Sequence, residues 1–478
     1  MAGHFGQRQF GRRQLGRWGN IRLTAAGAAA LAIALVLGAC GSGTSTAKPK
    51  DTTPTTSGTT QPVVETLGTG VTKDAIKIGV GLVDYDSIKD VPEVTEVRLH
   101  QQEIYQAFID YINEHGGVAG RKLVPVYEKY IPFDSSATQK VCTAFTDDDK
   151  VFAVTGTFYD ATGASQLCVT KQHQTVLLTF DIDKAMLDQA PPGLLVTPAS
   201  TPQRAVRILV KLLDDRHTFD GKKVAVLGQV KSSQIVNDSI VPALKDVGAD
   251  LGTTGLLNIQ GLDTSQPESQ LDSFIEKWKE EKVKIVFLSS YEASALRFVQ
   301  KLRKAMPDIQ LLSDNTQILG YGQGAKRANI DPNPYEGILA ASGPLHSQYE
   351  VSDNWKYCKD IYKEQTGETA PGPDDVIPYK GSKDKTIATY AVINDACQLL
   401  AMFDDIATKV GPWLNNDNWI NTVNHFGHIA NRGTGPYSSL GTGKYDADDN
   451  FQLVQFDSSL PPDGNFKSIT GLEDVPDE

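Results

Sequence analysis

The chain has 478 residues and carries 58 acidic side chains against 46 basic ones, which gives a formal net charge of −12 at pH 7. An acidic protein repels nucleic acid and anionic membrane surfaces. A nucleic-acid partner and adsorption to a membrane through a basic patch are therefore excluded. The length is enough for about two or three domain-sized cores.

The first 39 residues have the pattern of an export signal. They contain five arginines and no acidic residue, and the uncharged stretch Leu23–Leu37 has the length of a signal-peptide apolar region, too short for a membrane span. Leu37-Gly38-Ala39-Cys40 looks like a bacterial lipobox, in which Cys40 becomes the lipidated first residue. We therefore predict a lipoprotein signal peptide at residues 1–39 and a lipid-anchored protein on the extracytoplasmic face of the bacterial cell membrane. An uncleaved anchor helix is the alternative, and Arg12-Arg13 leaves the export route open between Sec and Tat.

Residues 41–70 consist largely of Gly, Ser, Thr and Pro. A segment of this composition cannot bury enough apolar surface to offset the entropy lost on ordering. We predict that residues 40–74 comprise the lipidated cysteine and a flexible tether to a folded body. Loss of the five signal-peptide arginines takes the net charge from −12 to −17.

Four cysteines follow Cys40, and an even count behind an export signal indicates disulfides. Four cysteines allow three pairings, and we predict that neighbours in the sequence pair, Cys142 with Cys168 and Cys358 with Cys397. Buried free thiols are the alternative. The cysteine spacings match no zinc pattern, so no metal site is predicted.

From Ala75 onward, short apolar runs alternate with helix-length amphipathic segments. Ile104, Phe108 and Ile112 mark one face of a helix that ends near Gly116-Gly117. Pro125 lies inside the next strand, where it cannot donate to a ladder, so this strand is predicted at a sheet edge. The predicted strands are residues 76–83, 123–127, 151–155, 176–179 and 194–197 in a first series and 224–227, 255–259, 285–288 and 311–313 in a second. This alternation is typical of an α/β protein with doubly wound parallel sheets, and two successive series predict two lobes.

Three stretches carry a resemblance to a known family. They are Ile112–Leu123, which reads INEHGGVAGRKL, then Val151–Gly156 and Tyr335–Leu339. Together they resemble the type I periplasmic solute-binding proteins, in particular the branched-chain amino-acid-binding (Leu/Ile/Val) branch that serves ABC importers. The resemblance extends from about Lys77 to Asp457.

This resemblance implies two lobes joined by three hinge crossovers. Hinges are expected near Ser200, Ala341 and Asn450, where the chain would cross between lobes. The predicted parts are residues 75–200 and 341–450 for the first lobe and residues 201–340 and 451–478 for the second.

Ligands of open α/β sheets bind beyond the carboxyl ends of the strands. The turns at these positions are rich in hydrogen-bond acceptors and aromatic side chains. The candidate ligand-binding residues are Tyr85, Tyr159, Asp160, Thr179, Asp181, Asp183, Tyr291 and Asn315.

Two of these candidates depart from the family pattern. In the amino-acid binders, the turns after the third and fourth strands present hydroxyls and backbone amides to a ligand carboxylate. Asp160 and Asp183 stand there instead and would repel a carboxylate. They favour a ligand with hydroxyl or amino groups, whereas the alternative role of both aspartates is helix capping.

We therefore predict a solute-binding protein that encloses a small polar ligand (amino acid, amide, amine or hydroxylated solute) between its lobes and delivers it to an ABC transporter permease. No enzymatic motif and no cofactor site is apparent. The alternatives are a ligand-sensing lipoprotein that docks on a signalling receptor and an envelope protein of the same fold without a transport role. Asp446–Asn450 resembles the start of a calcium loop, but Phe451 stands where the sharp turn needs Gly, so a polar turn is predicted.

Overall fold

The computed structural model describes residues 62–476 apart from 91–93, 95, 133, 159, 161, 260–264, 290–295, 315, 317–332, 374, 376, 381–384 and 461–463. The signal peptide, Cys40 and most of the tether lie outside the described residues, as do Tyr159, Tyr291 and Asn315. None of the helices within the described residues has the length and apolar character needed to cross a membrane.

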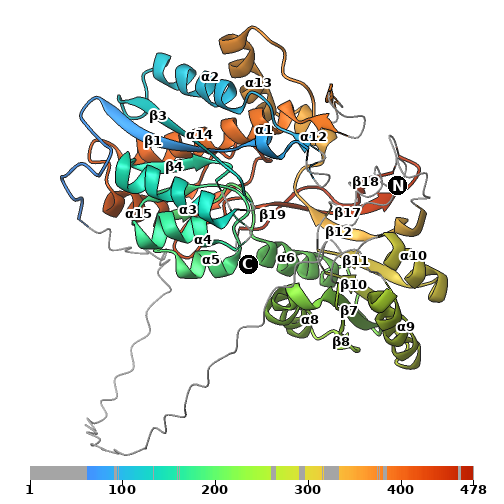
Figure 1. The fold of residues 1–478 in the computed structure, drawn as a ribbon. Helices are drawn as coiled ribbons and strands as arrows, with labels where there is room; N and C mark the ends of the chain where they lie inside the picture. Colours follow the sequence, from blue (N-terminus) through green and yellow to red (C-terminus); the bar gives the residue numbers. More distant parts are fainter. Residues whose placement is uncertain are drawn as a thin grey trace, which may run out of the picture. The chain divides into compact units, whose positions relative to one another are not determined.

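The first sheet consists of five parallel strands in the order β3-β1-β4-β5-β6 (Figure 1). Its strands are β1 (Ala75–Val83), β3 (Lys122–Tyr130), β4 (Ala153–Gly156), β5 (Val176–Leu178) and β6 (Leu195–Val196). β1 is buried along almost its whole length, as expected for a parallel strand covered on both faces. Pro125 lies on the edge strand β3 and pairs with Ile78 of β1, which confirms the edge position predicted from the missing N–H of proline.

The helix predicted before this edge strand is α2 (Gln101–Glu114). Gly116 and Gly117 follow it with φ of 105° and 68°, a left-handed backbone that stops the helix. A Cβ at Gly117 would lie 2.1 Å from the Arg121 oxygen, so the tight turn into β3 requires glycine there.

Three helices from the last third of the chain complete the core of the first sheet. They are α13 (Asp353–Thr366), α14 (Thr389–Val410) and α15 (Asn416–Asn424), and Figure 1 shows them beside the blue and teal strands. Trp355, Phe403 and Trp419 bury their rings in the same core as β1. The first sheet is therefore covered by segments that lie far away in sequence.

The second sheet has the order β18-β17-β12-β11-β10-β7-β8, with β9 paired to β7 and β19 to β17. Its strands are β7 (Lys223–Gln229), β8 (Asp250–Leu251), β9 (Gly255–Leu257), β10 (Val283–Leu288), β11 (Gln310–Ser313), β12 (Leu339–Ser342), β17 (Asn450–Asp457), β18 (Asn465–Ser468) and β19 (Glu473–Asp474). The strands up to β12 pair in parallel, as predicted, whereas β17 pairs antiparallel with its three neighbours. The sequence did not predict this antiparallel edge.

Helices α6 (Pro202–Asp214), α8 (Val241–Asp246), α9 (Ser265–Glu280) and α10 (Leu296–Ala305) pack on the second sheet. The chain passes between the two cores three times: from β6 to α6, from β12 to α12 (His346–Glu350), and from Ala447 to β17. The other described elements are short: α1 (Tyr85–Ile88), β2 (Glu96–Val97), α3 (Ser135–Thr143), α4 (Ala164–Leu167), α5 (Lys184–Gln189), α7 (Ser233–Ile235), β13 (Ile377–Pro378), β14 (Thr386–Ile387), β15 (Gly427–His428) and β16 (Ser439–Leu440).

The folded body begins before Ala75. Val64 N donates to Asn418 Oδ1 at 3.0 Å, and Asn415 Nδ2 donates to the Val64 and Thr66 oxygens at 3.0 and 2.7 Å. Gly68 N donates to the Leu414 oxygen at 2.8 Å. The prediction of a flexible tether through residue 74 is therefore wrong for its last part, because two asparagines satisfy this backbone and hold it against α15.

Both predicted disulfide pairs are present. Cys142 in α3 bonds to Cys168, which follows α4, and Cys358 in α13 bonds to Cys397 in α14. Each disulfide joins two helices that pack beside one another on the first sheet.

Candidate functional site

The carboxyl ends of β1, β4 and β5 meet at one edge of the first sheet. This edge carries five of the eight predicted ligand-binding residues within the described part of the chain: Tyr85, Asp160, Thr179, Asp181 and Asp183. These residues fall into two groups. Some side chains already make hydrogen bonds within the protein, and others have polar atoms without such a partner.

The Asp160 carboxylate makes hydrogen bonds within the protein. Its carboxylate accepts hydrogen bonds from the backbone N–H of Thr162 at 2.7 Å, Ala164 at 3.3 Å and Ser165 at 2.6 Å. Burial alone would raise the pKa of Asp160, but hydrogen bonds from Ser165 and Thr162 outweigh it and lower the pKa. The geometry is that of a carboxylate that caps the start of α4.

The side chains of Asp183 and Thr179 also make hydrogen bonds within the protein. Asp183 caps α5, since its carboxylate accepts the backbone N–H of Met186 at 2.8 Å. Thr179 is fully buried, and its hydroxyl donates to the Gly156 and Phe158 oxygens at 3.2 and 3.1 Å, which ties the ends of β4 and β5 together. Of the two roles considered for Asp160 and Asp183, the contacts support capping.

Asp181 differs from these two aspartates. Its backbone has φ of 54°, a left-handed conformation that costs energy for a residue with a Cβ. The residue is exposed, and no described residue donates a hydrogen bond to its carboxylate. Desolvation by the surrounding protein raises its pKa, while Arg98 acts in the opposite direction. Asp181 is therefore a carboxylate at the strand edge without a hydrogen-bond donor among the described residues.

An ion pair that the sequence did not predict lies at the same edge. Arg98, directly after β2, donates from Nη1 to Oδ2 of Asp395 in α14 at 2.5 Å. Burial raises the pKa of Asp395 to about 6 against the opposing effect of Arg98, and Asp181 raises it further. One signal in the sequence could have found Asp395, because a charged residue here interrupts the apolar run of a buried helix.

Two tyrosines complete this polar group. Burial raises the pKa of Tyr85, and the charges that act on it are Arg98, Asp395 and Glu96. Tyr105 of α2 is 1% exposed, and its hydroxyl has no hydrogen-bond partner among the described residues. Burial raises the pKa of Tyr105, Asp395 raises it further, and Arg98 lowers it. A cavity of about 300 Å³ is lined by Tyr85 and Arg98 together with the end of β1.

The second sheet contributes fewer described polar groups at its carboxyl edge. Ser289 follows β10 and is fully buried, and its hydroxyl donates to Asp314 Oδ2, after β11, at 3.2 Å. The candidates Tyr291 and Asn315 belong to these turns but lie outside the described residues.

The acidic run Asp446–Asn450, which resembles the start of a calcium loop, pairs with basic side chains of the protein. Arg204 Nη2 contacts Asp449 Oδ1 at 2.7 Å, and Lys444 Nζ contacts the same oxygen at 2.8 Å. Thr201 donates to Asp446 Oδ2 from its backbone N–H at 2.9 Å. The run forms a buried ionic cluster where the chain crosses between the two cores, so the prediction of a simple polar turn understated its role.

Two mainly parallel α/β sheets, joined by three crossings, define the fold of the type I periplasmic binding proteins. A family profile described as periplasmic binding protein matches residues 102–374, more than half of the chain. The protein therefore belongs to the periplasmic binding protein family.

Solved structures agree with this fold. The ABC transporter substrate-binding protein from Desulfitobacterium hafniense in complex with Leu is 15% identical, with a TM-score of 0.55, over 83% of this chain and 100% of that one. A solute-binding protein of an ABC transporter from Rhodopseudomonas palustris BisB5, in complex with 3,4-dihydroxybenzoic acid, is 14% identical, with a TM-score of 0.53, over 84% and 98%. The fatty acid ABC transporter substrate-binding protein from Thermomonospora curvata is 15% identical, with a TM-score of 0.52, over 86% and 95%.

All three are named as substrate- or solute-binding proteins of ABC transporters, and the compounds in their names differ in chemistry. No curated protein matches the chain. At these identities the similarity establishes the fold, so the ligand has to be inferred from the side chains of this protein.

Proposed function

We propose that the protein is an extracytoplasmic, lipid-anchored solute-binding protein that captures a small polar solute and delivers it to an ABC importer. Family membership supports the binding role, and the structural neighbours from ABC transporters support the transport role. The lipobox-like sequence before Cys40 supports the anchor. The branched-chain amino-acid branch remains the family branch that the sequence resembles.

The observation that carries the ligand assignment is the unpaired carboxylate of Asp181. Asp395 already has Arg98 as its partner, so the polar group holds one carboxylate more than its cations neutralise. A ligand with a protonated nitrogen supplies the missing positive charge and hydrogen-bond donor. Charge-assisted hydrogen bonds of this kind contribute about 1.5–3 kcal/mol.

The other acceptors at this edge fit the same ligand class. The side chain of Tyr85, which lines the cavity of about 300 Å³, offers a further polar contact and an aromatic surface. Amines and amino acids are therefore the first candidates, and amides and hydroxylated solutes follow. Asp160 and Asp183 no longer argue against a ligand carboxylate, because both act as helix caps.

Capture would proceed by closure of the two lobes about the three crossings near Ser200, Ala341 and Asn450. Each crossing is a short connection between a core of the first sheet and a core of the second. Ligand bound to both carboxyl edges would favour the closed form in proportion to its extra contacts there.

A thermal-shift screen of the mature protein against amino acids, amides, polyamines and hydroxylated acids tests the ligand assignment. A ligand present at about 100 times its Kd raises the unfolding free energy by about 2.7 kcal/mol, which is a readily measured rise in Tm. Stabilisation by neutral or anionic solutes only, with no response to any amine or amino acid, would contradict the assignment.

Fractionation of cells tests the anchor. Cys40→Ala removes the thiol that would carry the lipid, so the variant is expected to leave the membrane fraction. A variant that remains fully membrane-bound would indicate that the apolar segment Leu23–Leu37 is itself the anchor.

A further inference from the structure

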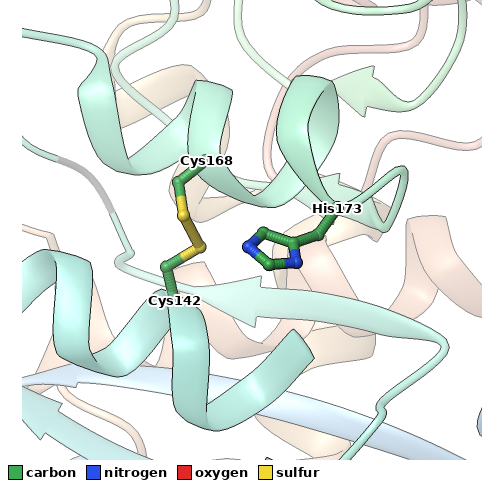
Figure 2. Close-up of side chains that lie close together, drawn as sticks. All are labelled: Cys142, Cys168 and His173. Carbon is green, nitrogen blue, oxygen red and sulfur yellow. A yellow bond between two sulfur atoms is a disulfide. The ribbon is translucent and has the colours of Figure 1, made fainter. Parts of the chain in front are cut away.

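A second cluster of reactive side chains lies away from the proposed ligand site. The sulfur atoms of Cys142 and Cys168 and a ring nitrogen of His173 all lie within 4.8 Å of one another. Figure 2 shows the imidazole of His173 directed at the disulfide. His173 directly precedes the turn into β5, so the cluster lies at the amino edge of the first sheet, opposite the edge that carries Asp181.

The imidazole is held in one orientation. Its Nδ1 contacts Asp147 Oδ1 at 3.2 Å, so Nε2 is the nitrogen that faces the sulfur atoms. The backbone N–H of His173 donates to the Cys168 oxygen at 3.1 Å, so the backbones of these two residues are held together. A histidine whose second nitrogen contacts a carboxylate is the usual arrangement of a metal-binding imidazole.

The backbone around the two cysteines is also unusual. A π-helical turn covers Ala144–Asp148, just after Cys142, and a second covers Cys168–Gln172. Such turns are rare and often mark functional positions. Here the first carries Asp147 and the second begins at Cys168 and ends beside His173, so both contribute to the same cluster.

The cluster can be reached from solvent on one side. Cys142 and Cys168 are fully buried, but the His173 side chain is 25% exposed. A cavity of about 380 Å³ borders it and is lined by Asp147, His173, Gln174 and Asn416 among others. An ion could therefore approach the imidazole without passing through the core.

We propose that Cys142, Cys168 and His173 form a redox-gated binding site for a thiophilic divalent cation such as Zn²⁺. The disulfide keeps the site closed, since both sulfur atoms are bonded to each other. A dithiol reductant opens it: the S–S bond takes up two electrons and two protons, and the reductant becomes a disulfide.

Cation binding then releases the two thiol protons. Two thiolates and Nε2 of His173 supply three ligands, and a water molecule in the neighbouring cavity supplies the fourth of a tetrahedral set. The sulfur atoms must separate to about 3.8 Å, the edge of a tetrahedron with Zn–S bonds of 2.3 Å. The Cα atoms of the two cysteines are already 6.4 Å apart, so side-chain rotation can provide this movement.

The second disulfide, Cys358–Cys397, serves as a control for this proposal. Cys358 and Cys397 are likewise buried and join two helices, but within the described residues no histidine or carboxylate joins them in a potential metal-binding group. Reduction of this pair is therefore not expected to create a three-ligand site.

The test is a titration of the mature protein with Co²⁺, whose thiolate bonds give a charge-transfer absorption band, with and without a phosphine reductant that does not chelate metals. The reduced protein is expected to bind one equivalent with this band, and the oxidised protein none. Cys358→Ser/Cys397→Ser should retain the band, and Cys142→Ser/Cys168→Ser should abolish it.

The histidine is tested separately. His173→Ala is expected to weaken Co²⁺ binding by tenfold or more, while His425→Ala, at an exposed histidine elsewhere, should leave it unchanged. Asp147→Asn should weaken binding by about 10- to 100-fold, the usual effect of losing a carboxylate that orients a histidine ligand.

Circular dichroism of the reduced protein accompanies each titration. A folded, reduced protein without a charge-transfer band overturns the proposal, as does a band that survives in Cys142→Ser/Cys168→Ser. Loss of the fold on reduction overturns it too, because the disulfide would then be a structural requirement rather than a gate.

Discussion

Two regions of this protein gather charged side chains, and they differ in how far those charges are paired within the protein. At the crossing between the cores, Arg204 is 3% exposed and its guanidinium donates to the Asp448 oxygen at 2.6 Å and to Asp449 Oδ1 at 2.7 Å. At the carboxyl edge of the first sheet, Asp181 and the hydroxyl of Tyr105 have no donor or acceptor among the described residues.

The difference separates a structural cluster from the proposed binding surface. Burial of charge is costly unless partners replace the lost water. A paired cluster such as that of Arg204, whose two terminal nitrogens both donate hydrogen bonds, therefore stabilises one arrangement of the chain. Groups left without partners at a strand edge lower stability and are retained where a ligand completes them. The following predictions test this contrast in order of decreasing effect.

Arg204→Met should have the largest effect on stability. The substitution leaves the buried carboxylate of Asp449 with only Lys444 as a counter-ion, and breaking a buried ion pair costs about 3–5 kcal/mol. Urea unfolding of the two proteins measures this change. Arg216→Met is the matched control, because its pair with Glu473 is partly exposed and its loss should cost about 1 kcal/mol or less. Equal effects of the two substitutions would contradict the contrast.

Asp181→Asn should affect ligand affinity rather than stability. Loss of a charge-assisted hydrogen bond of about 1.5–3 kcal/mol weakens an amine-bearing ligand by about tenfold or more in calorimetric titration. Asp183→Asn is the control, because asparagine caps a helix nearly as well as aspartate and α5 should persist. If Asp183→Asn weakened binding more than Asp181→Asn, the assignment of the two aspartates would be reversed.

The pH dependence of stability compares the two regions directly. Burial raises the pKa of Asp448 at the crossing and of Asp395 at the strand edge to about 6 in each case. The folded state therefore holds more protons than the unfolded state between about pH 4 and 6, and the free energy of unfolding falls as pH rises through this window.

Asp448→Asn removes one of these two titrations. The shift of about two pKa units corresponds to a free energy on the order of 2–3 kcal/mol. The variant should therefore lose less stability than the wild type between pH 4 and 6.5 in urea unfolding. A variant with an unchanged pH profile would indicate that Asp448 is already ionised at pH 4.

Tyr105→Phe should have the smallest effect on stability. Its hydroxyl is buried without a partner, so its removal is expected to leave the unfolding free energy unchanged or raise it by about 1 kcal/mol. Tyr130→Phe should instead cost about 1 kcal/mol, because the Tyr130 hydroxyl donates to the Thr157 oxygen. Weaker ligand binding in Tyr105→Phe would identify the hydroxyl as part of the site, and a clear loss of stability would argue for a structural role.

Much of the fold could be predicted from local pattern. The alternation of apolar runs and amphipathic segments identified the parallel strands of the first sheet and four of those in the second, but missed β8 and β12. Pro125 placed β3 at an edge because proline has no N–H to donate. The antiparallel edge around β17 could not be predicted, since strand direction depends on where the chain re-enters the sheet and not on side-chain period.

By itself the sequence determined the family and the two-sheet architecture, because these follow from patterns that neighbouring residues set. It allowed three disulfide pairings, and the tertiary structure shows which cysteines are close enough to bond. Only the tertiary structure decided which aspartates at the strand edge accept hydrogen bonds from the protein itself. Asp160, Asp181 and Asp183 look alike in sequence, but two of them are consumed by helix N–H groups and one is not. Arg98 and Asp395 form their pair across 297 residues, and charge partners at such distances are set by packing alone.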